Sequence, residues 1–283
     1  MKIIHKIDEL KSEIETYRSD KKNIGFVPTM GALHEGHISL VQRCVQENDI
    51  CIISIFVNPT QFNNSEDLAK YPRDLKQDSE MLEKAGCNLV FNPDPREIYT
   101  EAELSNTFNF DFEGLDQVME GKFRPGHFNG VVQIVSKLFN LIQPQKAYFG
   151  EKDFQQLAII HLMVTKLKMN TEIVDCQIIR EQSGLAMSSR NARLTTEQRK
   201  NAAQISKVLF ESRNFVLQSS PEELKNRVIT QINNTPDLKV EYFEIVDSES
   251  LQPIVNTWKR KAIGCIAVFC GEVRLIDNVR LNP

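Results

Sequence analysis

The chain has 283 residues, of which 41% are hydrophobic and 25% are charged, and its formal net charge is -4 at pH 7. This length accommodates one large domain or two smaller ones, and the composition is that of an ordinary globular protein. A weakly negative chain has no large attractive field for nucleic acid, although a local basic pocket is compatible with it.

Neither the cysteines nor the N-terminus indicates secretion. Six cysteines occur without a C-x-x-C pair or the density of a disulfide-stapled domain, so reduced, mostly buried thiols are expected. No apolar run approaches the ~20 residues that span a bilayer. The first residues instead predict an amphipathic helix, whose apolar face would comprise Ile3, Ile4, Ile7, Leu10 and Ile14. A cytoplasmic enzyme or binding protein is therefore expected, with no nucleic-acid or membrane partner.

Strand and helix patterns alternate through residues 1–179. Apolar, β-branched runs predict strands over residues 23–28, 49–57, 88–91, 146–149 and 172–179. Helical spacing predicts helices over residues 36–46, 74–85, 130–141 and 154–167. This alternation predicts an α/β fold with a doubly wound, Rossmann-like parallel sheet, in which ligands bind at the carboxyl ends of the strands.

The pattern changes after Arg180. Two polar helices are predicted over residues 196–218 and 221–233, followed by strands over residues 238–246, 262–269 and 273–276. Residues 180–283 are therefore expected to form a smaller C-terminal α+β domain.

The segment P-T-M-G-A-L-H-E-G-H, residues 28–37, lies where the first predicted strand leads into a helix. Gly31 permits a close turn, Gly36 lets a ligand approach the helix start, and the first helical N–H groups favour a polyphosphate. His34 and His37 would share one face if both were helical. Two histidines at this spacing also occur as a surface pair, a chance arrangement or a metal pair, but the preceding strand and turn favour a phosphate site.

Three further segments carry polar side chains of the same kind. In M-S-S-R-N, residues 187–191, serine hydroxyls and Arg190 suit a leaving pyrophosphate, although a solvated turn or helix cap is the alternative. In F-G-E-K-D-F-Q-Q, residues 149–156, Lys152 can meet a phosphate, unless it is solvated and Asp153 caps the next helix.

The segment V-N-P-T-Q-F, residues 57–62, follows the most apolar predicted strand. Asn58 and Gln61 can bind a small hydroxy acid while Phe62 walls the pocket. A plain Asn-Pro turn is the alternative.

Together with Y-P-R-D, R-P-G-H-F-N-G-V and L-A-M-S-S-R-N, these segments closely resemble the pantothenate synthetase family between about residues 23 and 195. The resemblance implies an ATP-dependent ligase that condenses (R)-pantoate with β-alanine through an enzyme-bound pantoyl adenylate, with Mg²⁺ as a cofactor and a homodimeric assembly. A nucleotidyltransferase of the wider superfamily, which releases a nucleotidyl product, is the alternative. A non-catalytic nucleotide-binding module is a second one.

The resemblance also implies roles for individual residues. His37, as proton donor, His34, Lys152 and Arg190 would be catalytic, while Gln61 and Gln156 would bind pantoate. The implied ATP contacts are Met30, Gly31, Ala32, Leu33, His34, Glu35, Gly36, His37, Gly150, Glu151, Lys152, Asp153, Ile179, Met187, Ser188, Ser189 and Arg190.

Metal ligands are not defined by the sequence. Asp78 is a weak candidate, for which a solvated position on a helix face is the alternative. Arg124 and His127 are candidates for a mobile wall over the adenylate, for which a plain surface loop is the alternative.

Overall fold

The computed structural model describes residues 1–63, 65–105 and 108–281. The chain divides into two compact units. Unit 1 comprises Met1–Glu113, Arg124–Glu151 and Gln156–Cys176, and unit 2 comprises Gly114–Phe123, Lys152–Gln155 and Gln177–Pro283. The division into domains of residues 1–179 and 180–283 stays a prediction, because contacts within a unit do not measure independent folding.

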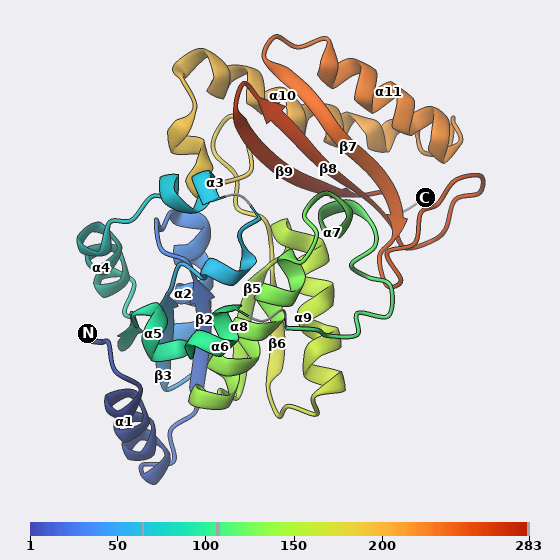
Figure 1. Cartoon of the computed structure of the whole chain (residues 1–283). Helices are drawn as coiled ribbons and strands as arrows, with labels where there is room; N and C mark the ends of the chain where they lie inside the picture. Colours follow the sequence, from blue (N-terminus) through green and yellow to red (C-terminus); the bar gives the residue numbers. More distant parts are fainter. Residues whose placement is uncertain (64, 106–107, 282–283) are drawn as a thin grey trace. The chain divides into compact units, whose positions relative to one another are not determined.

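Unit 1 is built on a six-stranded sheet with the order β1-β4-β3-β2-β5-β6, in which all paired neighbours are parallel (Figure 1). Its strands are β1 (Lys2–Ile4), β2 (Ile24–Thr29), β3 (Ile50–Ile55), β4 (Leu89–Phe91), β5 (Lys146–Gly150) and β6 (Glu172–Cys176). The predicted doubly wound α/β sheet is confirmed.

Helices follow most strands of unit 1. They are α1 (Ile7–Ser19), α2 (Glu35–Glu47), α3 (Ser65–Lys70), α4 (Leu75–Lys84), α5 (Pro95–Ile98), α6 (Glu101–Ser105), α8 (His127–Ile142) and α9 (Phe154–Lys166), with 3₁₀ turns η1 (Pro59–Gln61) and η2 (Glu151–Asp153). The first two residues of α9 and most of η2 belong to unit 2.

The central strands are covered on both faces. Val27 of β2 packs in one apolar cluster with Val41 and Cys44 of α2. Its neighbour Phe26 points to the other face, where its ring meets the edge of the Phe139 ring of α8, with centroids 6.2 Å apart. This two-sided burial explains why the segment reads as a continuous apolar run rather than an alternating one.

The N-terminus differs from its prediction. Ile3 and Ile4 lie in β1 and pair with Val90 and Phe91 of β4, so they are not part of a helix. The helix begins only at Ile7, and Leu10 and Ile14 form its buried face. Helical spacing of a few apolar residues does not distinguish an edge strand from the helix that follows it.

Unit 2 contains a three-stranded antiparallel sheet, β7-β8-β9, and two main helices. The strands are β7 (Leu238–Asp247), β8 (Ala262–Cys270) and β9 (Val273–Arg280), and the helical elements are α7 (Met119–Phe123), η3 (Ser189–Arg193), α10 (Thr196–Ser212), η4 (Arg213–Phe215) and α11 (Pro221–Asn233). The predicted helix over residues 196–218 therefore ends early, at Ser212. The expected α+β architecture is present, and its strands are antiparallel.

Local signals set the starts of both long helices of unit 2. Thr195 with Gln198, and Ser220 with Glu223, form capping boxes in which each side chain bonds the backbone N–H of the other residue. Their apolar faces meet the sheet in one cluster that includes Leu209, Leu224 and Ile266.

All six cysteines are free and buried, as expected. Among the helices that the structure describes, none combines the length and the apolar character needed to cross a membrane.

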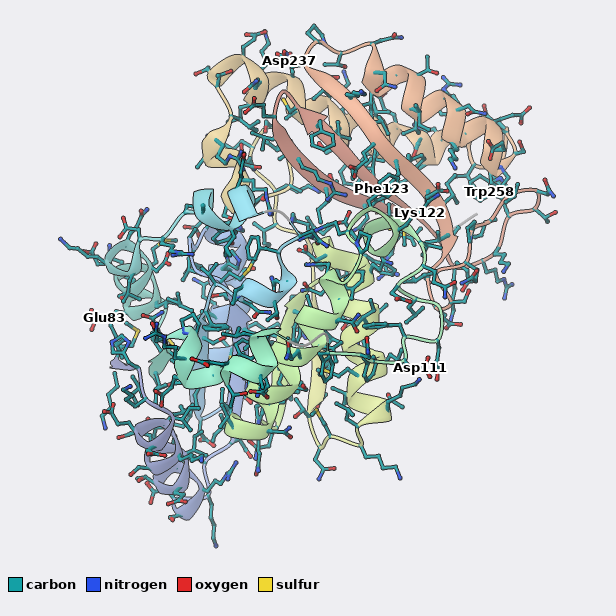
Figure 2. The ribbon with its side chains drawn as sticks, in the orientation of Figure 1. Glu83, Asp111, Lys122, Phe123, Asp237 and Trp258 are labelled. Carbon is teal, nitrogen blue, oxygen red and sulfur yellow. The ribbon has the colours of Figure 1, made fainter. Side chains whose placement is uncertain are left out.

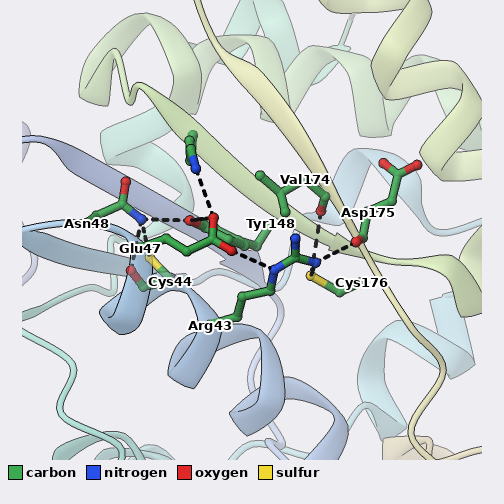
Figure 3. Close-up of polar contacts among 9 residues, drawn as sticks. Arg43, Cys44, Glu47, Asn48, Tyr148, Val174, Asp175 and Cys176 are labelled. Carbon is green, nitrogen blue, oxygen red and sulfur yellow. Dashed lines mark hydrogen bonds and ion pairs between the residues drawn. The ribbon is translucent and has the colours of Figure 1, made fainter.

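A polar network fastens α2 to the sheet of unit 1 (Figure 3). Arg43 donates to Glu47 Oε1 at 2.9 Å and to the carbonyl oxygen of Asp175 at 2.7 Å. Glu47 Oε2 also accepts from Lys146 Nζ at 2.9 Å and from the hydroxyl of Tyr148 at 3.1 Å. The network holds the C-terminal turn of α2 against β5 and β6.

The Glu47 carboxylate gives this network a pH dependence. Hydrogen bonds from Arg43 and then Lys146 lower the pKa of Glu47 from 4.5 to about 2. A lowered folded-state pKa contributes stability above the unfolded pKa, and this contribution is lost as the pH falls through the folded pKa.

We therefore expect Glu47→Gln to destabilise the protein most above about pH 5, with a difference from wild type that shrinks as the pH falls from 4.5 toward 2. Urea unfolding midpoints at about pH 7, 5 and 3.5 measure this. Glu249→Gln, which removes the exposed Lys261–Glu249 pair, is the control with little effect. A deficit that is independent of pH would contradict the expectation.

Candidate active site

Three of the four motifs leave the sheet of unit 1 at the same edge. The strands β3, β2 and β5 are adjacent and parallel, so their carboxyl ends lie side by side. Residues 30–37 follow β2, residues 58–61 follow β3, and Gly150 with Glu151 closes β5. These motif segments therefore lie at the carboxyl ends of the strands, where ligands bind in sheets of this kind.

The two histidines meet, although not as two residues of one helix. His34 has extended backbone angles and is the N-cap of α2, where its Nδ1 accepts from the backbone N–H of Gly36 at 3.1 Å. His37 lies in the first turn, and the ring centroids are 4.1 Å apart. Because Nδ1 of His34 accepts, a neutral His34 carries its proton on Nε2. His34 lies just before the helix, as the predicted helix over residues 36–46 implies, and the capping geometry brings both rings together.

Asp78 holds the turn that precedes these histidines. Its carboxylate in α4 accepts from the backbone N–H groups of Ala32 at 2.9 Å and Leu33 at 2.7 Å. Gly31 has φ +80°, and a Cβ there would lie 2.9 Å from Asp78 Oδ2. Burial raises the pKa of Asp78, while the two backbone hydrogen bonds oppose that shift. The interpretation of Asp78 as a solvated residue is wrong, since it is 2% exposed.

Asn58 is a bonded element of the 58–61 turn. It is 1% exposed, and its amide nitrogen donates to Gln61 Oε1 at 3.1 Å and to the carbonyl oxygen of Gly130 at 3.0 Å. Its amide oxygen accepts from the hydroxyl of Tyr99 at 2.8 Å. Both ends of the amide are used inside unit 1, which favours the turn alternative for Asn58.

Gln61 connects two motifs. With Oε1 engaged by Asn58, its Nε2 is directed at the sulfur of Met30, 2.9 Å away. The amide orientation is thus fixed with its donor end toward residues 30–37. Gln156, also in unit 1, lies in the first turn of α9.

The start of α8 packs against the turn that carries Gln61 and bonds its backbone. His127 is buried and its Nδ1 donates to the carbonyl oxygen of Gln61 at 2.8 Å. Gly130 allows α8 to approach η1 closely, because a Cβ there would lie 2.4 Å from the carbonyl oxygen of Thr60. His127 is therefore a buried residue at the start of α8, and the mobile wall expected of Arg124 and His127 stays a prediction.

Unit 2 carries the remaining candidates. Lys152 Nζ lies 3.3 Å from Asp153 Oδ2 in η2. Ile179 and Met187 are joined by a backbone hydrogen bond of 3.0 Å at the base of a hairpin-like loop.

The same loop ends in the M-S-S-R segment. Ser188 caps η3 by accepting from the backbone N–H of Arg190 at 3.2 Å. The loop interior is bonded by Asn191, which donates to Glu181 Oε1 at 2.9 Å and to the carbonyl oxygen of Ala186 at 3.1 Å. Arg190 and Ser189 therefore sit on a turn whose backbone is internally bonded.

A cavity of about 260 Å³ lies in unit 1 beside the Gly31–Asp78 contact. Of the candidate residues, Met30, Gly31 and Asp78 line it, together with residues that include Arg73 and Asn92. Within the described ranges, no group of three or more His, Cys, Asp or Glu side chains could hold a metal ion.

The chain matches known proteins over nearly its whole length. A family model described as Pantoate-beta-alanine ligase matches residues 2–280. The chain belongs to the pantoate–β-alanine ligase family. The pantothenate synthetase of Phocaeicola vulgatus is 56% identical over 283 residues, covering 99% of each chain.

Two solved structures are also similar. The pantothenate synthetase from Thermus thermophilus has a TM-score of 0.92 at 40% identity and covers 100% of both chains. The pantoate–β-alanine ligase from Francisella tularensis, complexed with beta-gamma ATP and beta-alanine, has a TM-score of 0.83 at 36% identity, covering 99% of this chain and 98% of that chain. The resemblance found in the motifs is confirmed, and the match extends through the C-terminal sheet of unit 2.

The close contact at Gly130 is open to a direct stability test. Gly130→Ala should destabilise the protein by about 1–3 kcal/mol, because the overlap with Thr60 outweighs the ~1 kcal/mol gain in helix propensity. Urea unfolding measures the change. Gly150→Ala is the matched control, since a Cβ there meets nothing within 4 Å. Equal stability of the two variants would refute the steric interpretation of Gly130.

Proposed function

We propose that this chain condenses (R)-pantoate with β-alanine to give pantothenate, AMP and pyrophosphate through an enzyme-bound pantoyl adenylate. Membership of the pantoate–β-alanine ligase family supports the reaction. The observation on which the proposed site depends is the contact of the Gln61 amide with Met30, which belongs to the same segment as the paired His34 and His37 rings. A pantoate-binding amide and a phosphate-binding pair of imidazoles would thus meet at adjacent strand ends.

Adenylation requires the pantoate carboxylate to attack the α-phosphorus of ATP while pyrophosphate leaves. This step needs positioning and neutralisation of charge, and no protein nucleophile. His34 and His37 stand at the N-terminus of α2, a 13-residue helix whose first N–H groups favour anions. In the proposal both contact the phosphates, and His37 donates a proton to the leaving group.

The other ATP contacts are proposed on the family resemblance. Lys152 and Arg190 would balance the charge of the polyphosphate, and Ser188 and Ser189 would donate to its oxygens. The remaining proposed contacts with ATP are Met30, Gly31, Ala32, Leu33, Glu35, Gly36, Gly150, Glu151, Asp153, the backbone of Ile179, and Met187.

Gln61 and Gln156 are proposed to bind pantoate, with Gln61 also facing β-alanine. Because Asn58 donates a hydrogen bond to Oε1 of Gln61, the Nε2 donor of Gln61 points toward residues 30–37, where it suits an oxygen acceptor of the ligand. Neutral amides hold a carboxylate without the ion pair that would lower its nucleophilicity. The amine of β-alanine then attacks the acyl carbonyl and AMP leaves.

Mg²⁺ is proposed as part of the ATP substrate rather than as a protein-bound centre. Mg²⁺ is commonly held by substrate phosphates with few protein ligands. Asp78, the one sequence candidate, already accepts two backbone hydrogen bonds. A cytoplasmic homodimer is also proposed, on the family resemblance alone.

The proposed roles of the histidines predict a specific loss. With ATP, Mg²⁺, pantoate and β-alanine, the wild type should release AMP only when both acids are present. His37→Ala should lower kcat for AMP release by about 10²–10⁴-fold, the usual value of a general acid, while the unfolding midpoint changes little. His161→Ala, which removes an exposed histidine paired with Asp175, is the control with wild-type rate.

Two results would overturn these assignments. A stable nucleotidyl product would favour the nucleotidyltransferase alternative, whereas AMP release at the full rate without β-alanine would mean that water, and not the amine, cleaves the adenylate. Unfolding of His37→Ala in parallel with its loss of activity would return His37 to a structural role.

The orientation of Gln61 predicts a substrate-specific effect. Gln61→Ala should raise KM for pantoate by roughly tenfold or more, since one hydrogen bond to a charged group contributes about 1.5–3 kcal/mol, while KM for ATP changes little. Gln77→Ala on the exposed face of α4 is the matched control. An equal rise of both KM values would argue against a pantoate contact.

A further inference from the structure

The edge strand β9 carries three polar side chains, Arg274, Asp277 and Asn278, within the segment V-R-L-I-D-N. Each bonds a different part of unit 2, and the parts include the residues proposed to meet the polyphosphate. We propose that Asp277 and Asn278 are positioning residues for adenylation: Asp277 positions the Arg190 loop and Asn278 positions Lys152. This inference rests on the proposed function, in which Lys152 and Arg190 contact ATP.

Asp277 acts on the loop through Arg180. The two side chains form a bidentate pair, with Nη1–Oδ2 at 2.7 Å and Nη2–Oδ1 at 2.8 Å. The Asp277 side chain is 3% exposed and that of Arg180 is 18% exposed. Such a pair is strongly directional, because the planar guanidinium matches the carboxylate at two points.

Arg180 in turn forms the base of the loop that ends in Arg190. Its backbone bridges to Ala186, and its Nη1 also donates to the carbonyl oxygen of Gly184 at 3.1 Å. The guanidinium lies over the Phe210 ring of α10, with its carbon 4.9 Å from the centroid. One side chain from β9 therefore fixes the guanidinium around which residues 180–186 fold.

Asn278 reaches the other phosphate-binding segment. Its amide nitrogen donates to the carbonyl oxygen of Lys152 at 3.1 Å. The register between β8 and β9 is unbroken from Cys270↔Val273 to Ile263↔Arg280, so Asp277 and Asn278 project from opposite faces of the strand. Two consecutive residues thus direct two different segments, one on each side of the sheet.

Arg274 lies on the same face of β9 as Asn278 and binds residues 114–123, another segment of unit 2. It binds Glu120 through Nη1 at 2.9 Å and Nη2 at 2.6 Å, and Glu120 also accepts from the hydroxyl of Tyr242 at 2.8 Å. The ring of Phe123, labelled in Figure 2, stacks on Tyr242 with centroids 5.2 Å apart.

Gln155 links this anchored segment to Lys152. It accepts from the backbone N–H of Glu120 at 2.9 Å and donates to the carbonyl oxygens of Leu115 at 2.6 Å and Val118 at 2.8 Å. The backbone of Lys152 is therefore constrained on one side by Asn278 and, three residues later, by Gln155.

Placement of this kind matters for adenylation because a shift of about 1 Å in a charge-stabilising group can cost on the order of 10²-fold in rate. Asn278→Ala and Asp277→Asn should each lower kcat for ATP–pyrophosphate exchange with pantoate by about tenfold, with KM for pantoate unchanged. Lys225→Met is the matched control, since it removes the 2.8 Å pair between Lys225 of α11 and Glu244 of β7 in the same sheet, and it alters none of the residues in the two positioned segments.

A merely structural role is excluded by combining variants. If Asn278 acts through Lys152, Asn278→Ala adds little to Lys152→Ala but keeps its full effect in Arg190→Ala. Asp277→Asn should show the reverse pattern. Asp277→Glu, which keeps the carboxylate, should recover part of the rate. Where the residual exchange of a variant is too slow to follow, the same single and double variants are compared by their ATP affinity, measured by calorimetry.

The outcomes separate this inference from the proposed function. Wild-type exchange by Lys152→Ala and Arg190→Ala would reject the proposed phosphate contacts themselves. Loss of exchange in those variants, together with wild-type exchange in Asn278→Ala or equal losses in both backgrounds, would reject only the positioning role. Should Asp277→Asn fail to fold, the Asn278→Ala cycle alone decides between these results.

Discussion

Burial of both faces of β2 and β3 limits where unit 1 can place polar chemistry. Val27 and Phe26 contact helices on opposite sides of the sheet, so a polar side chain in the strand interior would be buried without water. The backbone leaves this apolar environment only where the strands end. Because the strands are parallel, these ends share one edge, and three separate motifs converge there without being close in sequence.

A strand end alone does not fix a loop, and here each loop is held by a buried polar group from a distant segment. Asp78 accepts from the turn that carries the histidines, and His127 donates to the backbone of Gln61. In unit 2, Asp277 binds Arg180 and Asn278 binds Lys152. We call these four residues, Asp78, His127, Asp277 and Asn278, the anchors. A buried acceptor or donor costs about 1–3 kcal/mol when its partner is missing, so a loop conformation that breaks an anchor's hydrogen bond is disfavoured. The anchors therefore make the loop geometry a consequence of folding.

The difference between local and distant determinants explains what the sequence could predict. The strands β2 to β6 and the helices α2, α4, α8 and α9 of unit 1 follow from periodicity, whereas β1 and the short helices α3, α5 and α6 do not. The capping boxes at Thr195 and Ser220 are visible as spacings of three residues. The spacing of His34 and His37 alone does not distinguish an N-cap from a helical position, so the capping role of His34 needed the structure. The anchors lie beyond such patterns: Leu33 and Asp78 are 45 positions apart, and Lys152 and Asn278 are 126 apart. A single aspartate or asparagine has no local signature that distinguishes an anchor from a solvated residue.

The same distinction explains why sequence motifs reveal the candidate ligand-binding residues but not the anchors that hold their loops in place. A phosphate site at a strand end needs a glycine turn or a helix start, and those neighbours make a recognisable segment, as around His37, the proposed proton donor. An anchor needs no such neighbours in sequence, because the fold brings its side chain to the loop. In β9 the alternation of side chains converts two adjacent positions into anchors for two segments, because Asp277 and Asn278 face opposite sides. One strand of the antiparallel sheet in unit 2 thus holds two segments that are too far apart in sequence for a local turn to position both.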